Sequence, residues 1–374
     1  MKGYLPYIFF FAATIIASCK STSGIGDYWS HGVDVNGNVY MTPPPPGQGI
    51  QINVLPFPVP DSTEVQGDFY FDLPSDVDFS VGRIEIAMNE GSHQMNCYKT
   101  ISVWPADSGL ASKTIMHFDN GNADTIITRF QNEFNTTIVR TNGNLIIESQ
   151  LPYLNWTLPE LNSGTDSAKQ KVIQLSAKQH MVVESHYVNI ANFPSGGSQV
   201  TPNGKGAIII NLWKANSSEQ LVPASMLYAR KTDLIIPPHS DTSDLKDCTF
   251  PGLDPTKFPI YLMAMTGHFN SRGKNFRIDK IQNITNAQGK VIGDSVSQTG
   301  IYKSSSWDES LFTVYDPPVQ LNKNQFIRII AEYANNTNYI ILFGPHVSNQ
   351  ERCDLFSWFV PAYNGGQTIY DDQN

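Results

Sequence analysis

The sequence predicts an all-β protein built of two β-sandwich domains in tandem. Short runs of alternating apolar residues, rich in Val, Ile, Tyr and Phe, recur along the chain, which is typical of half-buried strands. Gly, Pro, Asn, Asp and Ser separate these runs, as in the turns between antiparallel strands. Convincing amphipathic helices are absent, and 374 residues are enough for two domains of ordinary size.

The expected strands follow one another along the chain without a helical segment between them. Each is a short run of β-branched or aromatic residues that ends at a turn residue. They cover residues 67–73, 82–88, 125–130, 136–141, 144–149, 181–190, 207–213, 232–238, 260–265, 326–333, 339–344 and 355–361. A stretch rich in Gly, Ser and Pro, from Phe193 to Gly206, divides two halves of similar size. We therefore expect an N-terminal domain over 50–200 and a C-terminal domain over 205–370.

The N-terminus predicts an exported, lipid-anchored protein. An apolar stretch from Tyr4 to Ala17 is shorter than a spanning helix, so residues 1–18 are interpreted as a signal peptide. The sequence "IASC", ending at Cys19, looks like a bacterial lipobox, in which the exposed cysteine carries lipid such as palmitate. The alternative is an ordinary signal peptide cleaved near Ser18.

Residues 19–49 are expected to tether the folded part to the membrane. Within them, "TPPPPGQG" predicts a polyproline II spacer. With lipid on Cys19, the protein would belong to the bacterial cell envelope, on a periplasmic or surface face, with the membrane as a partner. The sequence leaves the membrane and its leaflet open.

Composition disfavours nucleic acid as a partner. Lys and Arg number 25 against 34 Asp and Glu, which gives a formal net charge of −9. A net negative charge disfavours binding to the negatively charged phosphate backbone of a nucleic acid. The chain also has no P-loop, dinucleotide-binding turn, Gly-x-Ser-x-Gly elbow or His-Glu-x-x-His helix, so most familiar enzyme classes have no support.

Three cysteines follow Cys19 in the chain. In an oxidising compartment the odd number permits one bridge and one leftover thiol. Cys248 and Cys353 both lie in the second half and are the expected pair, whereas Cys97 stands alone in the first half.

Three histidines are candidate metal ligands. His186 and His268 lie on apolar runs, and His93 follows one in "IEIAMNEGSHQM". A single histidine on a strand is usually structural. Imidazole is, however, the commonest ligand for copper and zinc, and the rigid strands of a sandwich allow ligands to converge.

Six motifs, taken in order, resemble a known family. They are "GDFYFDLP", "RIEIAMNEGSHQM", "LPEL", "VVESHYVN", "YLMAMTGHFNSRGKNFRI" and "FGPHVSNQERCDLFSWFVPAY". Together they are similar to landmarks of the copper type II, ascorbate-dependent monooxygenases, which include peptidylglycine α-hydroxylating monooxygenase and dopamine β-monooxygenase. The resemblance covers Ile50 to Tyr363. It implies two jelly-roll domains, each with one copper, facing each other across a solvent-filled cleft.

The resemblance leaves the first copper site with two of its three histidines. The family has a His-His-Met turn and a later His-Tyr strand. Here the turn reads His93-Gln94-Met95, and His186 matches the later strand. Gln94 is a poor ligand for Cu(I), so copper affinity should fall. Met95 or Cys97 would either offer sulfur or pack into the core.

The second copper site of the family has lost more of its ligands in this chain. Where the family has His-x-His, this chain has Thr266 and then His268, which share a strand face. Where the family has a methionine before a cysteine, this chain has Arg352, a cation that would repel copper. His346 and Met265 are the candidates to compensate, although Met265 has the wrong strand parity.

One further position departs from the family. The cysteine that usually pairs with the one at Cys353 is replaced by Ala331. Arg352 itself indicates either a pocket for a carboxylate or anionic ligand, or a surface salt bridge.

The incomplete ligand set implies a catalytically impaired or non-catalytic surface protein that binds a small molecule, a glycan or another protein. One alternative is an active copper-dependent monooxygenase that hydroxylates a C–H bond with O2 and a reductant. Another is a protein that binds a single copper through His93 and His186. Copper is thus the one cofactor that the sequence suggests, with partial occupancy.

Overall fold

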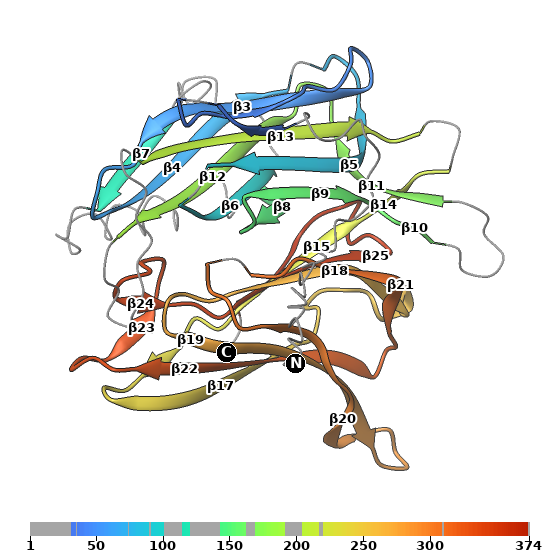
Figure 1. Ribbon diagram of the computed structural model, residues 1–374. Helices are drawn as coiled ribbons and strands as arrows, with labels where there is room; N and C mark the ends of the chain where they lie inside the picture. Colours follow the sequence, from blue (N-terminus) through green and yellow to red (C-terminus); the bar gives the residue numbers. More distant parts are fainter. Residues whose placement is uncertain are drawn as a thin grey trace, which may run out of the picture.

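A computed structural model describes residues 31–34, 36–73, 75–89, 91–100, 114–119, 143–161, 169–190, 204–216, 220–308 and 310–372. Over these residues the protein is all-β, with two jelly-roll-like sandwiches in tandem, which confirms the predicted fold class (Figure 1). The helical element among them is one 3-10 turn, η2 (Pro255–Lys257). No helix in these ranges has the length and apolar character needed to cross a membrane.

The first domain is a sandwich of two sheets. The outer sheet has the order β10-β11-β5-β13-β3, with β9 on β5 and β14 on β11. Its strands are β3 (Gly49–Pro58), β5 (Phe79–Met88), β9 (Tyr153–Thr157), β10 (Glu160–Leu161), β11 (Lys169–Leu175), β13 (Lys205–Lys214) and β14 (Val222–Pro223). The inner sheet, of order β7-β4-β12-β6-β8, faces the second domain. Its strands are β4 (Thr63–Asp72), β6 (Ser92–Thr100), β7 (Thr114–Asp119), β8 (Gly143–Ser149) and β12 (His180–Asn189).

The second domain repeats this arrangement. Its inner sheet, of order β21-β18-β25-β15-β26, faces the first domain. The strands are β15 (Ser225–Arg230), β18 (Ile260–His268), β21 (Thr313–Leu321), β25 (Asp354–Val360) and β26 (Ile369–Asp371). Its outer sheet comprises β17 (Ser240–Cys248), β22 (Gln325–Asn335), β19 (Gly273–Thr285) and β20 (Val291–Ser304). A small third sheet holds β16 (Ile235–Ile236), β23 (Ile341–Phe343) and β24 (Gln350–Glu351).

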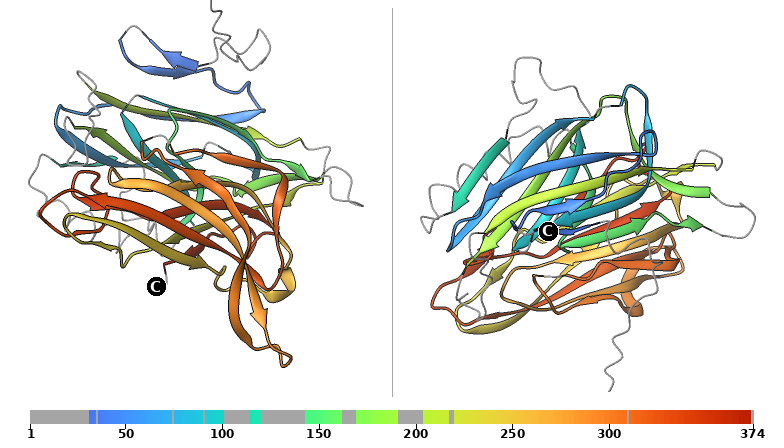
Figure 2. Two further views of the ribbon diagram at one scale, coloured as in Figure 1. Left: turned by 60° about the horizontal axis from the view of Figure 1, so that its bottom comes forward. Right: turned by 45° about the horizontal axis from the view of Figure 1, so that its top comes forward.

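The two inner sheets face each other at the domain interface (Figures 1 and 2), and β9 of the outer sheet joins them at one end, where Trp156 contacts Trp358. One apolar core fills the first sandwich and continues into the interface, where it includes Tyr228, Phe356 and Trp358 of the second domain. A second core fills the second sandwich. Because the first core crosses the interface, the two domains pack as one body at that end.

The domain boundary lies later than the sequence predicts. Strand β13 follows the Gly-, Ser- and Pro-rich stretch, but it pairs with β3 and β5 in the outer sheet of the first domain. Its apolar residues Ile208, Ile210 and Leu212 complete that core. Strands β12 and β13, which flank that stretch, thus both belong to the first sandwich, so the predicted boundary at 200–205 is wrong, and β15 is the first strand of the second domain.

Part of the predicted tether is folded onto the first domain. Strands β1 (His31–Val33) and β2 (Val39–Met41) form a hairpin, and the His31 ring stacks on Tyr153 with centroids 3.5 Å apart. Asn211 Nδ2 donates to the Thr42 carbonyl at 2.9 Å. Of residues 19–49, the part from His31 onward therefore belongs to the folded body.

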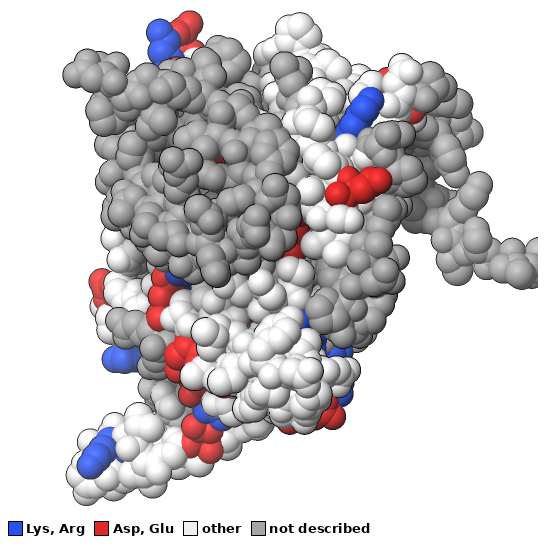
Figure 3. All heavy atoms as spheres, turned by 90° about the vertical axis from the view of Figure 1, so that its left-hand side faces the viewer, with Lys and Arg blue, Asp and Glu red and all other residues white. Residues whose placement is uncertain are grey.

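Several expected features fall outside the described residues. These are the signal peptide, Cys19, and the expected strands at 125–130 and 136–141. On the face drawn in Figure 3, the described charged side chains are scattered among uncharged ones.

A long hairpin made by β19 and β20 projects from the second domain (Figures 1 and 2). Apolar residues near its tip are exposed, with Ile292 at 64% and Val291 at 51%. This arm lies far from the interface between the inner sheets.

Candidate functional site

Strand alternation directs His186 toward the domain interface. On β12, Tyr187 points into the first sandwich, where its hydroxyl donates to the Ala207 carbonyl of the outer sheet at 2.8 Å. Since neighbouring side chains on a strand alternate, His186 points out of the sandwich toward the second domain. Gln94 of β6 is its direct Cα partner and is also buried.

A β-bulge brings His93 beside His186. Between β6 and β12, Gln94 pairs with His186 while Ser92 pairs with Tyr187, so His93 is the extra residue. A bulge of this kind re-aims a side chain that regular alternation would direct elsewhere. Met95, in contrast, keeps the regular direction and packs in the core of the first domain.

His268 approaches from the second domain. It ends β18, and the residue before it, Gly267, faces the second core: a Cβ there would lie 2.5 Å from the Phe276 ring. His268 therefore points the opposite way, toward the first domain. Thr266 has the same parity as His268 and is buried, and Met265 packs in the second core, as its parity predicts.

The three candidate histidines meet in one place, which we call the histidine cluster: His93, His186 and His268. The His93 ring centroid lies 5.1 Å from that of His186 and 4.7 Å from that of His268. Trp307 covers the group, with its centroid 5.4 Å from that of His93. None of the three histidines is more than 3% exposed.

Glu64 of β4 supports one side of the cluster. Its Oε2 lies 3.3 Å from His186 Nε2 and 3.4 Å from His346 Nδ1. The backbone amides of Val347 and Ser348 donate to the same carboxylate at 3.3 and 3.0 Å. Burial raises the pKa of Glu64, but the bonds from the two histidines outweigh it and lower the pKa below the usual value, so the group is a carboxylate.

Asn270 supports the other side. Its Nδ2 donates to the carbonyls of Gly344, His346 and Gln350 at 3.2 to 3.4 Å, which fixes the amide so that Oδ1 faces His93 Nε2 at 3.2 Å. Because Oδ1 only accepts, the proton of His93 lies on Nε2.

Several imidazole nitrogens of the cluster have no hydrogen-bond partner. They are His93 Nδ1 and both ring nitrogens of His268. Burial lowers the pKa of His93 to about 3, with the neighbouring His186 adding to the effect, and it lowers the pKa of His268 well below the usual value. These rings are therefore neutral at pH 7, and each unpartnered nitrogen is a buried polar atom without compensation.

Arg352 lies in the same interface and forms an ion pair with Asp354. Its Nη1 is 2.9 Å from Asp354 Oδ2, and both side chains are buried. The neighbouring Glu351 instead accepts backbone N–H bonds from Asn270, Arg272 and Arg352. The surface salt bridge considered from the sequence is thus a buried one.

These positions do not fit two separate copper sites. Two coppers facing each other across open solvent would need the ligands of each domain apart, whereas His93 and His268 touch across a closed interface. A guanidinium also stands near all three histidines and contributes to lowering the pKa of each. Among the described residues, no three His, Cys, Asp or Glu side chains are placed to hold a metal ion as they stand.

The predicted disulfide is not formed. Cys248 and Cys353 are both free, buried thiols in the second core, and Cys97 is a free thiol in the first core. Burial raises the pKa of Cys353 to about 12, which keeps it as an unreactive thiol. Cys248 and Cys353 act here as small apolar side chains.

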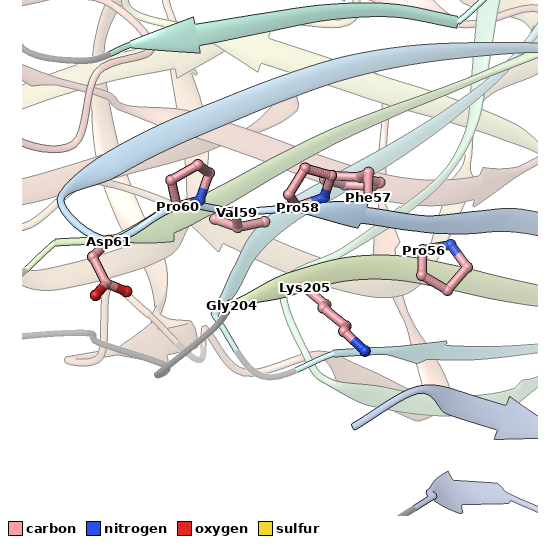
Figure 4. A pocket seen from close by; sticks show the side chains of 8 residues that line it. All are labelled: Pro56, Phe57, Pro58, Val59, Pro60, Asp61, Gly204 and Lys205. Carbon is pink, nitrogen blue, oxygen red and sulfur yellow. The ribbon is translucent and has the colours of Figure 1, made fainter. Parts of the chain in front are cut away.

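Three surface hollows lined by described residues lie away from the histidine cluster. The largest of those described, about 580 Å³, is formed by the end of β3 and the start of β13, from Pro56 to Asp61 with Gly204 and Lys205. Figure 4 shows Asp61 at one end, Pro56 at the other and the Lys205 side chain between them. Two further hollows, of about 400 and 380 Å³, lie on the second domain. Predicted site residues line none of the three.

Comparisons with known proteins identify no family. No family model matches the chain, and no curated protein matches it. Among solved structures, the Sputnik virophage has 8% identity and a TM-score of 0.20, with 95% of this chain and 90% of that chain covered. A protein of Parabacteroides distasonis described as secreted has 9% identity and a TM-score of 0.18, with 89% and 92% covered. The VP2 subviral particle of infectious bursal disease virus has 7% identity and a TM-score of 0.16, with 85% and 73% covered. Values this low carry no conclusion about function.

Proposed function

We propose that the chain is a non-catalytic binding protein of a bacterial cell envelope, held to a membrane by lipid on Cys19. Its ligand would be a small molecule, a glycan or another protein. The observation that carries the proposal is the contact between His93 and His268, whose ring centroids lie 4.7 Å apart across a buried interface.

The chemistry of the family it resembles supports this choice. Hydroxylation there uses one copper in each domain, with oxygen bound at an open coordination position of the second. Here the retained ligands form one closed cluster, and the position of the family methionine carries Arg352, paired with Asp354. The scaffold is therefore better suited to presenting loops and surfaces than to activating oxygen. The hollow between Pro56 and Lys205 is a candidate place for the ligand.

Copper stoichiometry tests the proposal. The full-length chain would be incubated anaerobically with copper and a reductant, passed through a desalting column and analysed for metal. We expect fewer than two coppers per chain. Two tightly retained coppers would overturn the proposal, because they would require both family sites.

A second candidate function is the binding of a single copper, which the unpartnered nitrogens of His93 and His268 favour. Cu(I) prefers imidazole ligands, and the Glu64 carboxylate is placed as a supporting partner of His186. A bound copper ion would supply a redox centre or a transferable cargo.

Matched histidine variants separate the two candidates. One copper per chain, lost in His93→Ala, in His186→Ala and in His268→Ala alike, would establish the second candidate. The control is His180→Ala, on the same strand as His186 but paired with Asp72 outside the cluster. If no copper is retained by the wild type, only the binding-protein proposal stands.

A further inference from the structure

A hollow of about 400 Å³ opens on the outer sheet of the second domain, at the base of the β19–β20 arm. On β19, Phe276 and Ile278 pack in the second core, so Arg277 between them points to the solvent face. Ile330 of β22 is the direct Cα partner of Arg277 and shares that face. Small-molecule sites occupy about 300–1,000 Å³, so this hollow has room for a small ligand. We call it the arm-base hollow. Among the side chains that line it are those of Asn275, Arg277, Lys303, Leu311, Ile330 and Glu332.

Two cations lie directly opposite each other beside the hollow. Arg277 of β19 is the Cα partner of Lys303 on β20. Like charges in this arrangement destabilise a sheet. The stem of Lys303 lies against Gly300, where an added Cβ would come within 2.3 Å of Lys303 Cε. The sheet therefore holds two positive charges close together, an arrangement that a bound anion would stabilise.

The carboxylate of Asp279 compensates only part of this charge. Its Oδ1 accepts from the Gly300 amide at 2.7 Å and lies 3.2 Å from Arg277 Nε, without the geometry of a hydrogen bond. Asp279 is 2% exposed and does not line the hollow. Within the described part of the chain, Lys303 Nζ forms no hydrogen bond or ion pair. Two positive charges thus meet one enclosed negative charge on this side of the hollow.

A carboxylate lies on the other side of the hollow. Glu332 is two residues after Ile330 on β22, so the two side chains share a face. Glu332 Oε2 accepts from Asn275 Nδ2 at 2.7 Å, and no Lys or Arg in the described ranges forms an ion pair with it. Leu311, which is 57% exposed, and the half-buried Ile330 add apolar surface. The hollow therefore combines a cationic side, an anionic side and apolar contacts.

These charges select among classes of ligand. A purely anionic ligand would be attracted by Arg277 and Lys303 but repelled by Glu332, and a purely cationic ligand would meet the reverse. A zwitterion meets both signs. An α-amino acid carries a carboxylate and an ammonium group on one carbon atom, and an apolar side chain on that carbon would cover Leu311 and Ile330.

We propose that the arm-base hollow binds an α-amino acid with an apolar side chain. The ligand carboxylate accepts from the Arg277 guanidinium and the Lys303 ammonium, which are strong donors to carboxylates. The ligand ammonium donates to Glu332. This site goes beyond the function proposed above, because it depends neither on lipid at Cys19 nor on copper.

Calorimetry on the full-length chain tests the proposal with L-leucine as the probe. Isocaproate is leucine without its ammonium group, and isoamylamine is leucine without its carboxylate. We expect one leucine per chain and at least tenfold weaker binding of each analogue, because each leaves a charged group of the hollow without its partner. Absence of saturable leucine binding by the wild type would overturn the proposal. Isocaproate binding as tight as that of leucine would also overturn it, since Glu332 would then contribute nothing.

Variants of the two sides of the hollow separate their contributions. Lys303→Met should weaken leucine binding at least threefold. Glu332→Gln should weaken leucine to the level of isocaproate without weakening isocaproate itself. A Glu332→Gln variant that loses affinity for both compounds equally would contradict the assigned contact with the ammonium group.

Lys274→Met is the matched control. It removes the same charge from the same strand as Arg277, but Lys274 pairs with Asp241 at 2.8 Å and does not line the hollow. Leucine affinity should be unchanged in this variant. An equal loss of affinity in Lys274→Met and Lys303→Met would overturn the proposal, because only the net charge of the chain would then matter.

Discussion

The two ends of the domain interface are built from different side chains. At one end, Trp358 of the second domain meets the rings of Trp156 and Phe312, with centroids 5.2 Å away in each case. At the other end, imidazoles, carboxylates and Arg352 meet. At the apolar end the buried side chains are stabilised by packing. Most of the buried polar atoms around the interface that have no hydrogen-bond partner lie at the polar end. Apolar packing and polar contacts thus occupy different ends of one surface, and the following variants test that division.

The largest effect is expected from Trp358→Ala. The side chain is 2% exposed, and its Nε1 donates to the Ile146 carbonyl of the first domain at 3.0 Å. The variant leaves a cavity and an unpartnered carbonyl, so we expect a loss of about 5 kcal/mol in the free energy of unfolding, measured in urea. Trp358→Phe keeps most of the packing and should lose less than half as much. Equal losses would show that the hydrogen bond, and not packing, dominates this end.

Arg352→Met should follow. It leaves Asp354 buried without its cation, which we expect to cost about 3–4 kcal/mol in urea unfolding. The double variant Arg352→Met/Asp354→Leu removes both charges and should recover most of that loss. If the double variant is as unstable as the single variant, balancing the two charges does not by itself explain what the ion pair contributes to the free energy of unfolding.

His268→Leu should change stability in the opposite direction. Both ring nitrogens of His268 are buried without partners, so an apolar side chain of similar volume should raise the free energy of unfolding by about 1 kcal/mol in the presence of a chelator. Destabilisation by the same amount would show that a partner other than a metal ion holds the His268 ring, and it would contradict the expected cost of the two buried nitrogens.

Ile292→Asn should have the smallest effect. The residue is 64% exposed on the β19–β20 arm, outside both ends of the interface. We expect the free energy of unfolding, measured in urea, to change by no more than about 0.5 kcal/mol. A loss above 1 kcal/mol would mean that the arm packs against something in solution.

Much of the fold could be predicted from local pattern. Alternation on β12 places Tyr187 in the core and His186 outside it. Alternation on β18 likewise predicts that Met265 points away from the face of Thr266 and His268, and it packs in the second core. The position of β13 could not be predicted, because it lies between β3 and β5, two strands distant in the chain that no local pattern pairs with it, and a Gly-rich stretch indicates only a break between strands. The predicted disulfide was wrong for a similar reason, since Cys248 and Cys353 are free thiols that pack as apolar side chains in the second core.

The candidate site was predicted in its members but not in its arrangement. His93, His186 and His268 were identified from residue type and motif order, yet they were assigned to two sites. Glu64 and Asn270, which fix the cluster, carry no signal beyond a polar residue at the edge of a β run. Their roles depend on contacts with residues between 74 and 284 positions away in the chain.

The sequence by itself determined the strands, their alternation and the residue types available for chemistry, because these follow from short-range backbone and side-chain preferences. Only the tertiary structure decided that the two inner sheets close on each other, and that a bulge turns His93 toward His186 and His268. It also decided which polar atoms remain unpartnered. Such outcomes depend on burial and on partners distant in the chain, which no local pattern encodes.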